Sequence, residues 1–282
     1  MDFLSFFSDI ESFIVDYSDG DIEPFTKGGF SKVFSYRNKI YIVQKYSKDI
    51  ELIYDKLEQL GNKKHVLMPT ERSYVLKDKN NEDEELVLEF ETCNGDLFLG
   101  QNDKSSENAL KIIRENSDKY KEQFREIVQT VKSIHKMGIR TMDIKPANML
   151  YCEGSVIKMT DFGGSMYLQN GEWKGEGSGT LGYAAGSWES GKYLTPYQED
   201  LFALYLSFIE ILEPLENNFM DRIRKGKERI LSMMKKAKSS MVKQFLQEML
   251  KIPEYKVNSN PKMPPRRRNS RRISLSQLNL KF

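Results

Sequence analysis

The sequence predicts an α+β fold with a strand-rich first part and a helical second part. Between residues 25 and 46, β-branched and aromatic residues recur at short spacing around two tight turns, which is typical of three antiparallel strands. From residue 119 onward, apolar residues recur mainly at steps of three and four, as on amphipathic helices. The 282 residues, 39% of them hydrophobic, allow one large domain or two small ones.

A helix is expected before the strands, as an N-terminal extension over residues 1–21. The turn formers Asp19, Gly20 and Asp21 end it, and Pro24 follows. The apolar residues that recur at helical spacing are Phe3, Leu4, Phe6, Phe7, Ile10, Phe13, Ile14 and Tyr17.

After the first strands, the apolar pattern predicts a helix over residues 48–60 that ends at Gly61. Strand-like runs follow at 65–68 with 74–76, and at 85–90, separated by a charged turn. The remaining elements predicted from spacing are a helix at 119–137, strands at 149–152 and 156–159, and an apolar helix at 202–212.

The charge is divided unevenly along the chain. Residues 219–282 hold 18 basic and 4 acidic residues, whereas residues 1–218 hold 25 basic and 37 acidic ones. Two basic helices are expected in residues 219–250, and residues 253–282 are expected to be a basic, flexible tail. The helices either close the helical part with their apolar faces inward, or form a calmodulin-type target or a membrane-surface helix.

Several classes of protein are excluded by composition. No apolar run approaches the ~20 residues of a membrane-spanning helix, and the acidic N-terminus does not have the basic start of a signal peptide. Two cysteines make a disulfide framework unexpected and favour a reducing compartment, the cytoplasm or nucleus. Two histidines do not build a histidine-rich metal site.

The chemistry is concentrated in residues 137–167. Asp143 is followed by Lys145 and Asn148, and after a predicted hairpin by Asp161 in the sequence Asp-Phe-Gly. Phosphoryl transfer requires a set of this kind: a carboxylate near the attacking hydroxyl, a cation near the moving phosphoryl group, and oxygen ligands for magnesium. Asp and Asn are also common in turns, so Asp143, Asn148 and Asp161 could be ordinary turn formers. The segments before and after them favour the chemical interpretation, because they too have the residues that phosphoryl transfer would need.

This spacing resembles the catalytic and magnesium loops of the protein kinase superfamily. The resemblance covers about residues 22–215 and implies a bilobal protein-kinase-like fold with a β-rich N-lobe and a trimmed helical C-lobe. The kinase-like domain is expected at 22–252, with the N-lobe at about 22–91 and the C-lobe at about 92–252. By resemblance, Asp143 is the catalytic base, Lys145 the cation beside the phosphate, and Asn148 and Asp161 the Mg²⁺ ligands.

The resemblance also implies an ATP site in the first part of the chain. Lys45 stands where the family has its ATP-anchoring lysine, and Glu51, Asp55 and Glu58 are alternative partners for it on the following helix. A phosphate loop with few glycines, which needs backbone amides close to the phosphates, would be formed by Thr26, Lys27, Gly28, Gly29, Ser31 and Val33.

The resemblance places the adenine and ribose contacts in the following segment, residues 86–96. Leu88 matches the bulky residue at the back of the pocket, with backbone groups of Glu89 and Glu91 at the adenine edge. Asp96 lies where an acid often meets the ribose.

Further along, Thr180, in Gly-Thr-Leu-Gly-Tyr, resembles the hydroxyl that bridges the catalytic Asp and Lys in serine/threonine kinases. Asp200 resembles the buried acid that anchors the catalytic loop, and His135 a structural histidine.

The chain departs from the family pattern at several positions. Thr141 and Met142 replace the His-Arg pair before the catalytic Asp, so control by activation-loop phosphorylation becomes doubtful. Residues 185–187 replace Ala-Pro-Glu and remove the acid of a lobe-stabilising salt bridge.

The expected function is an ATP-dependent serine/threonine protein kinase with a protein substrate. The alternatives are a pseudokinase or scaffold that binds a partner through the fold and its extensions, and a small-molecule kinase of the aminoglycoside type. Lys145 with Pro146 and the Asp-Phe-Gly turn weigh against the last. The tail offers Ser270 and Ser274 after arginine pairs as phosphorylation sites, or a patch for a regulatory protein, nucleic acid or anionic lipid.

Overall fold

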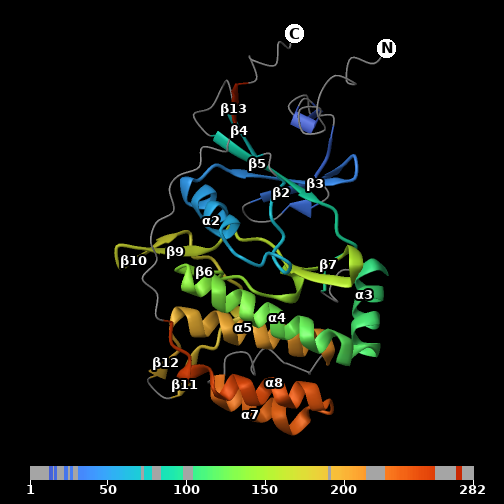
Figure 1. The fold of residues 1–282 in the computed structure, drawn as a ribbon, viewed down its shortest axis with the longest axis vertical. Helices are drawn as coiled ribbons and strands as arrows, with labels where there is room; N and C mark the ends of the chain where they lie inside the picture. Colours follow the sequence, from blue (N-terminus) through green and yellow to red (C-terminus); the bar gives the residue numbers. More distant parts are fainter. Residues whose placement is uncertain are drawn as a thin grey trace. The chain divides into compact units, whose positions relative to one another are not determined.

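The computed structural model describes residues 13–14, 16–17, 22–24, 26–27, 31–70, 73–77, 84–97, 104–189, 192–213, 226–257 and 271–274. The chain forms two compact units (Figure 1). The first unit comprises residues 1–51, 68–92 and 265–282, and the second comprises 52–67 and 93–264. Among the described residues the first unit is built on a sheet and the second mainly on helices, which confirms the predicted α+β class.

The first unit contains a six-stranded sheet in the order β1-β2-β3-β5-β4-β13. The turn between β2 and β3 consists of Arg37 and Asn38, both with positive φ (47° and 60°), which is the conformation that suits a two-residue hairpin. The strands are β1 (Thr26–Lys27), β2 (Ser31–Tyr36), β3 (Lys39–Lys45), β4 (Ser73–Lys77), β5 (Glu84–Glu91) and β13 (Arg271–Ser274).

Part of the predicted N-terminal helix packs on this sheet. Phe13, Ile14, Asp16 and Tyr17 are helical, and the rest of the prediction for residues 1–21 lies outside the described residues. The Phe13 ring stacks on that of Tyr41 with 4.1 Å between centroids, and both side chains are completely buried. The apolar cluster that they share also contains Ile14, Phe34, Val43, Tyr74, Leu76 and Val87.

The β13 strand differs from the expected flexible tail. It pairs in parallel with β4, so that Ile273 lies opposite Leu76. The reason is that β4 would otherwise be the sheet edge, where unpaired N–H and C=O groups bind any extended segment within reach. A four-residue sequence as polar as Arg-Arg-Ile-Ser gives no strand signal of its own.

The second unit has its core between helices. Phe124 on α4 packs against Phe208 on α5 and Phe245 on α8, with ring centroids 4.5 Å and 5.8 Å away. In Figure 1 α4, α5 and the pair α7 and α8 follow one another as successive layers of this unit. The helices are α2 (Lys48–Glu58), which begins in the first unit, α3 (Lys104–Glu115), α4 (Ser117–Lys136), α5 (Pro196–Leu212), α7 (Gly226–Lys236) and α8 (Ser240–Leu250).

Short strands complete the second unit. Strand β6 pairs with β9, and β9 with β10, in a three-stranded sheet, while β7 pairs with β8 and β11 with β12. The predicted strand at 65–68 is reduced to a bridge between Val66 and Met159. The strands are β6 (Ile139–Arg140), β7 (Met149–Cys152), β8 (Val156–Met159), β9 (Met166–Gln169), β10 (Glu172–Gly175), β11 (Ser187–Glu189) and β12 (Lys192–Tyr193).

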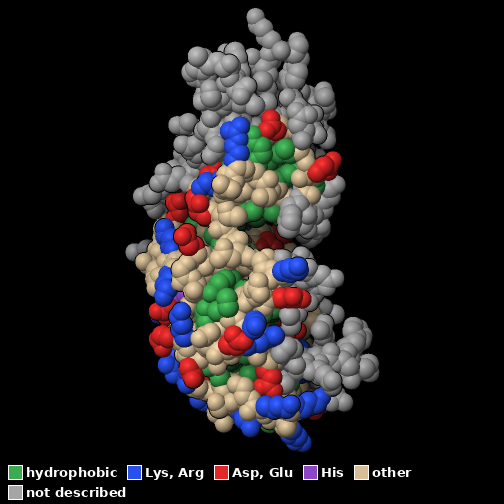
Figure 2. Space-filling view, turned by 90° about the vertical axis from the view of Figure 1, so that its right-hand side faces the viewer, with side chains coloured by type: hydrophobic (Ala, Val, Ile, Leu, Met, Phe, Trp, Pro, Cys, Tyr) green, Lys and Arg blue, Asp and Glu red, His purple; other side chains and the backbone are tan. Residues whose placement is uncertain are grey.

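The basic helices α7 and α8 close the second unit. Most of their apolar side chains, including Ile230, Met233 and Phe245, are buried, whereas Leu231 is 44% exposed. The buried face is not available to a calmodulin-type partner or a membrane. Their lysines are on the outside, and Figure 2 shows Lys and Arg side chains gathered at its lower end, where α7 and α8 lie. Across the described residues, the structure contains no helix long and apolar enough to cross a membrane.

Two buried side chains, His65 and Lys56, tie the loop before β4 and helix α2 to α4. His65 is completely buried and makes hydrogen bonds with Glu126 (2.7 Å) and the Ile157 carbonyl (2.7 Å). Lys56 is almost completely buried, donates to the Met137 carbonyl at the end of α4, and has its pKa lowered by desolvation. A helix C-terminus favours a cation, which compensates part of the cost of burying one.

Cys93 and Cys152 form a disulfide, which contradicts the expectation of unpaired cysteines. The chain after β5 runs beside β7, because Asn94 donates to the Tyr151 carbonyl and Tyr151 to the Gly95 carbonyl. This backbone pairing brings the two Cα atoms to 4.2 Å, a separation that follows from tertiary structure and not from sequence spacing.

Replacing Phe13 with alanine is expected to destabilise the protein by about 3–5 kcal/mol, because it removes a completely buried ring from the sheet cluster. Denaturant unfolding of the two proteins measures the difference. The matched control is Tyr193→Ala, which removes an aromatic side chain that is 75% exposed and should cost less than about 0.5 kcal/mol. Equal effects of the two substitutions would contradict docking of the N-terminal helix on the sheet.

Reduction of the disulfide is expected to lower the free energy of unfolding by about 2–4 kcal/mol, because the bond closes a long loop in the unfolded chain. The measurement is the unfolding midpoint with and without a thiol reductant. A Cys93→Ser, Cys152→Ser double variant should be insensitive to reductant; a wild type that is equally insensitive would show that the bond is absent.

Candidate active site

Two predicted residues in the loop between β6 and β7, Asp143 and Lys145, meet Thr180, which lies after β10 in the same unit. The Asp143 carboxylate accepts hydrogen bonds from Thr180 Oγ1 (2.7 Å) and from Lys145 Nζ (2.8 Å). Lys145 Nζ also donates to Thr180 Oγ1 at 3.0 Å. A carboxylate, an ammonium group and a hydroxyl thus form a closed triangle.

Asn148 and Asp161 lie beside this triangle. The Asn148 amide nitrogen donates to the Asp143 carbonyl (2.8 Å) and carboxylate (3.1 Å), so its amide oxygen is the atom offered to a cation. Thr160 donates to the Asn148 carbonyl, which places Asp161, the next residue, close to Asn148. A small recess of about 10 Å³ is lined by Asp143, Asn148 and Asp161 among others.

The two carboxylates of the site have opposite pKa shifts. Burial works against ionisation of Asp143, but the hydrogen bonds from Lys145 and Thr180 outweigh it and lower the Asp143 pKa. Asp161 reaches solvent, yet its crowded surroundings desolvate it, and together with the negative charge of Asp143 this raises the Asp161 pKa. A bound cation would relieve the repulsion between the two carboxylates.

The donor set fits magnesium bound together with a phosphate ligand. Mg²⁺ is typically held by one or two carboxylates, with phosphate oxygens and water completing its octahedron. Asp161 supplies a carboxylate and Asn148 an amide oxygen. Over the described ranges no cluster of three His, Cys, Asp or Glu residues makes a metal site from protein groups alone.

Asp200, at the start of α5, holds the loop in place. Its carboxylate accepts the backbone N–H of Thr141 (2.7 Å) and of Met142 (3.1 Å), and it is 2% exposed. Met142 has φ 68°, a left-handed conformation that costs a non-glycine residue about 1–2 kcal/mol. The bonds to Asp200 hold Met142 in this conformation and so direct the next residue, Asp143.

The residues predicted to bind the phosphates and the adenine belong to the first unit. Thr26 and Lys27 form β1, and Ser31 and Val33 lie in β2 opposite Gln44 and Ile42 of β3. Gly28 and Gly29 lie outside the described residues. These assignments stay predictions.

Lys45 ends β3 and is exposed. Of its three candidate partners, Glu51 is in the same unit and accepts a hydrogen bond from the Tyr46 hydroxyl (2.8 Å), while Asp55 and Glu58 belong to the second unit. The choice among them stays a prediction.

Glu89 is engaged inside the sheet. Its carbonyl accepts the Thr70 N–H (2.8 Å), and its carboxylate accepts the hydroxyls of Thr70 (2.8 Å) and Tyr41 (3.2 Å). Glu91 forms an ion pair with Lys39. The role of both residues at the adenine edge remains a prediction, as does that of Asp96, which accepts a hydrogen bond from Ser106.

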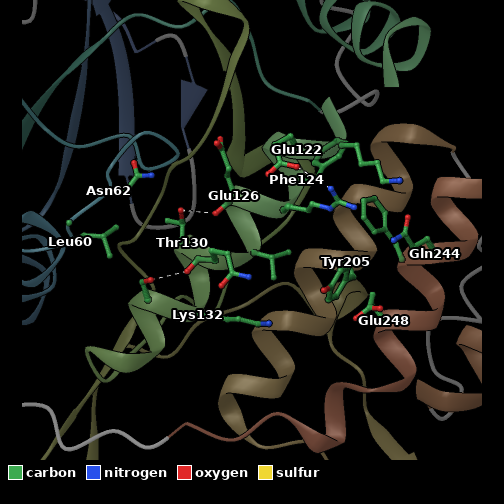
Figure 3. A pocket seen from close by; sticks show the side chains of 17 residues that line it. Leu60, Asn62, Glu122, Phe124, Glu126, Thr130, Lys132, Tyr205, Gln244 and Glu248 are labelled. Atoms are coloured by element: carbon green, nitrogen blue, oxygen red, sulfur yellow. Dashed lines mark hydrogen bonds and ion pairs between the residues drawn. The ribbon is translucent and has the colours of Figure 1, made fainter. Parts of the chain in front are cut away.

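A larger hollow of the second unit lies away from these residues. It measures about 690 Å³ and lies between α4, α5, α8 and the loop at Leu60 (Figure 3). Its rim carries charges of both signs, including Lys132, Glu126 and Glu248, and it contains none of the predicted catalytic or metal-binding residues. Size alone therefore does not identify the active site.

Comparison with known proteins identifies the family. The family model for the protein kinase domain matches residues 23–263. This chain belongs to the protein kinase family. Its bilobal α+β fold is therefore the protein-kinase fold.

Similar kinases are found in distant organisms. The chain is 30% identical over 155 residues, half of its length, to a probable serine/threonine-protein kinase, pkgA, of Dictyostelium discoideum. It is 26% identical over 214 residues, 68% of its length, to an interferon-induced, double-stranded RNA-activated protein kinase of Rattus norvegicus, and 29% over 153 residues, 52% of its length, to cAMP-dependent protein kinase catalytic subunit 3 of Drosophila melanogaster. The matches span 10%, 40% and 25% of these relatives.

The segment around Thr180 has anchors that the sequence did not reveal. A Cβ at Gly179 would lie 2.9 Å from the Met142 carbonyl oxygen, so only glycine lets Thr180 come this close to Asp143. Beyond it, Arg229 donates to the Gly182 carbonyl (3.2 Å), and Tyr183 forms a hydrogen bond with Glu210.

Glu199 also holds this segment of the kinase. Its carboxylate accepts the Ala185 N–H at 2.9 Å, and burial raises its pKa. It thus gives the segment an acidic anchor although residues 185–187 lack the usual glutamate. Sequence reasoning missed it because it is one of many acids; its place next to Asp200 at the start of α5 was the available signal.

Replacing Asp200 with asparagine is expected to destabilise the kinase by about 1.5–3 kcal/mol. The Thr141 and Met142 N–H groups bond different carboxylate oxygens, and the amide keeps only one acceptor oxygen, so one of these buried donors faces the NH₂ group instead. Denaturant unfolding measures this difference. Glu153→Gln, in an exposed turn, is the control and should stay within about 0.5 kcal/mol of wild type. A small effect of Asp200→Asn would mean that the loop is held by other contacts.

Proposed function

We propose that this chain is an ATP-dependent serine/threonine protein kinase that transfers the γ-phosphate of Mg-ATP to a protein hydroxyl. The triangle of Asp143, Lys145 and Thr180 carries this proposal, because its three groups are in hydrogen-bonding contact within one unit. Asn148 and Asp161, beside it, add the oxygen ligands that a magnesium-dependent reaction needs.

In this proposal Asp143 binds and orients the attacking hydroxyl. Its lowered pKa keeps it ionised at neutral pH, so it accepts the hydroxyl hydrogen bond and then the proton as the new O–P bond forms. Lys145 stabilises the negative charge of the moving phosphoryl group, and ADP leaves as the bond to the γ-phosphorus breaks. Magnesium, held by Asn148 and Asp161, would neutralise the phosphate charge.

The serine/threonine preference is supported by Thr180. Its hydroxyl contacts both Asp143 and Lys145, as expected for the substrate-seating threonine in kinases of this class. Relatives named as serine/threonine-protein kinases agree with it at about 30% identity. In the first unit, Lys45 and residues 26–33 are proposed to bind the ATP phosphates, with Glu89, Glu91 and Asp96 on the nucleoside.

Replacing Asp143 with asparagine is expected to lower phosphoryl transfer by about 100- to 10,000-fold, because asparagine keeps the shape but cannot accept the proton. The measurement is incorporation of labelled γ-phosphate from Mg-ATP into a mixed protein substrate such as casein. The matched control is Glu172→Gln, an exposed carboxylate paired only with Lys174 among the described residues, which should retain full activity.

Equal incorporation by wild type and Asp143→Asn would overturn the enzymatic proposal, as would none from either; the latter result would favour the scaffold. Acid hydrolysis of the labelled product tests the hydroxyl preference: phosphoserine and phosphothreonine are expected, and a product dominated by phosphotyrosine would contradict it.

A further inference from the structure

A chain of hydrogen bonds connects the segment after α8 to the catalytic loop. The Tyr255 hydroxyl lies 3.1 Å from His135 Nδ1, and His135 Nε2 lies 3.1 Å from an Asp200 carboxylate oxygen. Asp200 in turn accepts the N–H groups of Thr141 and Met142, next to Asp143. One path of side chains thus runs from residue 255 to the catalytic loop, within the second unit.

Tyr255 is held firmly at the start of this path. The Gln198 side-chain amide donates to the carbonyls of Pro253 and Tyr255, both at 3.0 Å. Ile252, in the 3-10 turn Ile252–Glu254, is 3% exposed, and Lys132 lies 5.6 Å from the centre of the Tyr255 ring. The segment expected to begin a flexible tail is therefore part of the folded unit.

The direction of the hydrogen bonds follows from the acceptor at the far end. Asp200 only accepts, so His135 must donate to it through Nε2–H. In the neutral ring Nδ1 then carries a lone pair and needs a donor, which the Tyr255 hydroxyl supplies. Burial raises the pKa of Tyr255 to about 12, with the charge of Asp200 contributing, so the hydroxyl keeps its proton at neutral pH.

We propose that Tyr255 is a positioning residue for phosphoryl transfer: it fixes the His135 tautomer that donates to Asp200, and Asp200 then holds the catalytic loop. The proposal rests on the proposed kinase function. His135 is completely buried, so a ring that loses the Tyr255 donor leaves a buried polar atom without its protein partner. A ring that changes tautomer or rotates presents a lone pair to the Asp200 carboxylate, and the loop bonds to Thr141 and Met142 loosen.

The test is Tyr255→Phe, which removes the hydroxyl and keeps the ring that packs near His135 and Lys132. The expected result is a kcat lower by about 3- to 10-fold. This is the rate change that corresponds to losing the net free energy of one hydrogen bond. KM values for ATP and for the protein substrate should change less than about twofold, because the contacts of Tyr255 are with His135, Gln198 and Lys132, which are not among the residues proposed to bind either. The matched control is Tyr193→Phe, at a side chain that is 75% exposed, which should leave both constants unchanged.

A second readout separates positioning from packing and does not depend on activity. The chain has two histidines, so nitrogen NMR of ¹⁵N-histidine-labelled protein gives one signal set for His135 and one for His65, the internal reference. In wild type, His135 should show Nε2 protonated and Nδ1 hydrogen-bonded, and Tyr255→Phe should change these signals and leave those of His65 in place.

The outcomes distinguish this inference from the proposed function. Unchanged His135 signals in Tyr255→Phe would overturn it, and so would an unchanged kcat in an active protein. A lower kcat with unchanged His135 signals and a lower unfolding midpoint would show a purely structural role and would also overturn it. If wild type transfers no phosphate, the kinase proposal fails, and the NMR comparison still decides whether Tyr255 sets the His135 tautomer.

Discussion

The buried carboxylate of Asp200 is the constraint on which the active site depends. Two backbone N–H groups of the catalytic loop converge on it, and one of them belongs to Met142 in a left-handed conformation that the sequence does not favour. A strained backbone conformation of this kind persists only where surrounding contacts hold it in place, as the bonds to Asp200 do here. Asp200 follows the first turn of α5 directly, and its carboxylate also lies 3.1 Å from His135 Nε2, so one buried group contacts both the loop and α4.

Around this anchor, three further side chains of the helical unit hold neighbouring segments in place. Glu199 accepts the Ala185 N–H, and Arg229 donates to the Gly182 carbonyl. Tyr255 reaches His135 from the end of the unit. Each of these contacts satisfies a backbone group or a buried ring nitrogen, and an unsatisfied buried group costs more than a hydrogen bond returns. Glu199 thus holds the Ala185 backbone, although residues 185–187 contain no glutamate.

The basic residues of the last part of the chain lie in two different structural settings. The lysines of α7 and α8 form the solvated face of helices that bury most of their apolar side chains, as expected for helices that close a folded unit. At the far end of the chain, Arg271–Ser274 joins the sheet of the first unit through backbone pairing with β4. That pairing is largely independent of side-chain type, which explains why composition alone favoured a flexible tail.

The sequence by itself determined the fold class and the strands at 149–152 and 156–159, because periodicity is a local property of the chain. Motif spacing likewise named the candidate site residues, whose catalytic and metal-binding roles remain a proposal: Asp143, Lys145, Asn148, Asp161 and Thr180. Only tertiary structure decided which distant groups meet. The disulfide of Cys93 and Cys152 depends on a pairing across 59 residues, and the contact of Tyr255 with His135 spans 120. Glu199 and Tyr255 belong to no recognisable sequence motif, so nothing in the sequence distinguishes them from other acids and tyrosines. Their roles follow from tertiary contacts, with the Ala185 N–H and with His135.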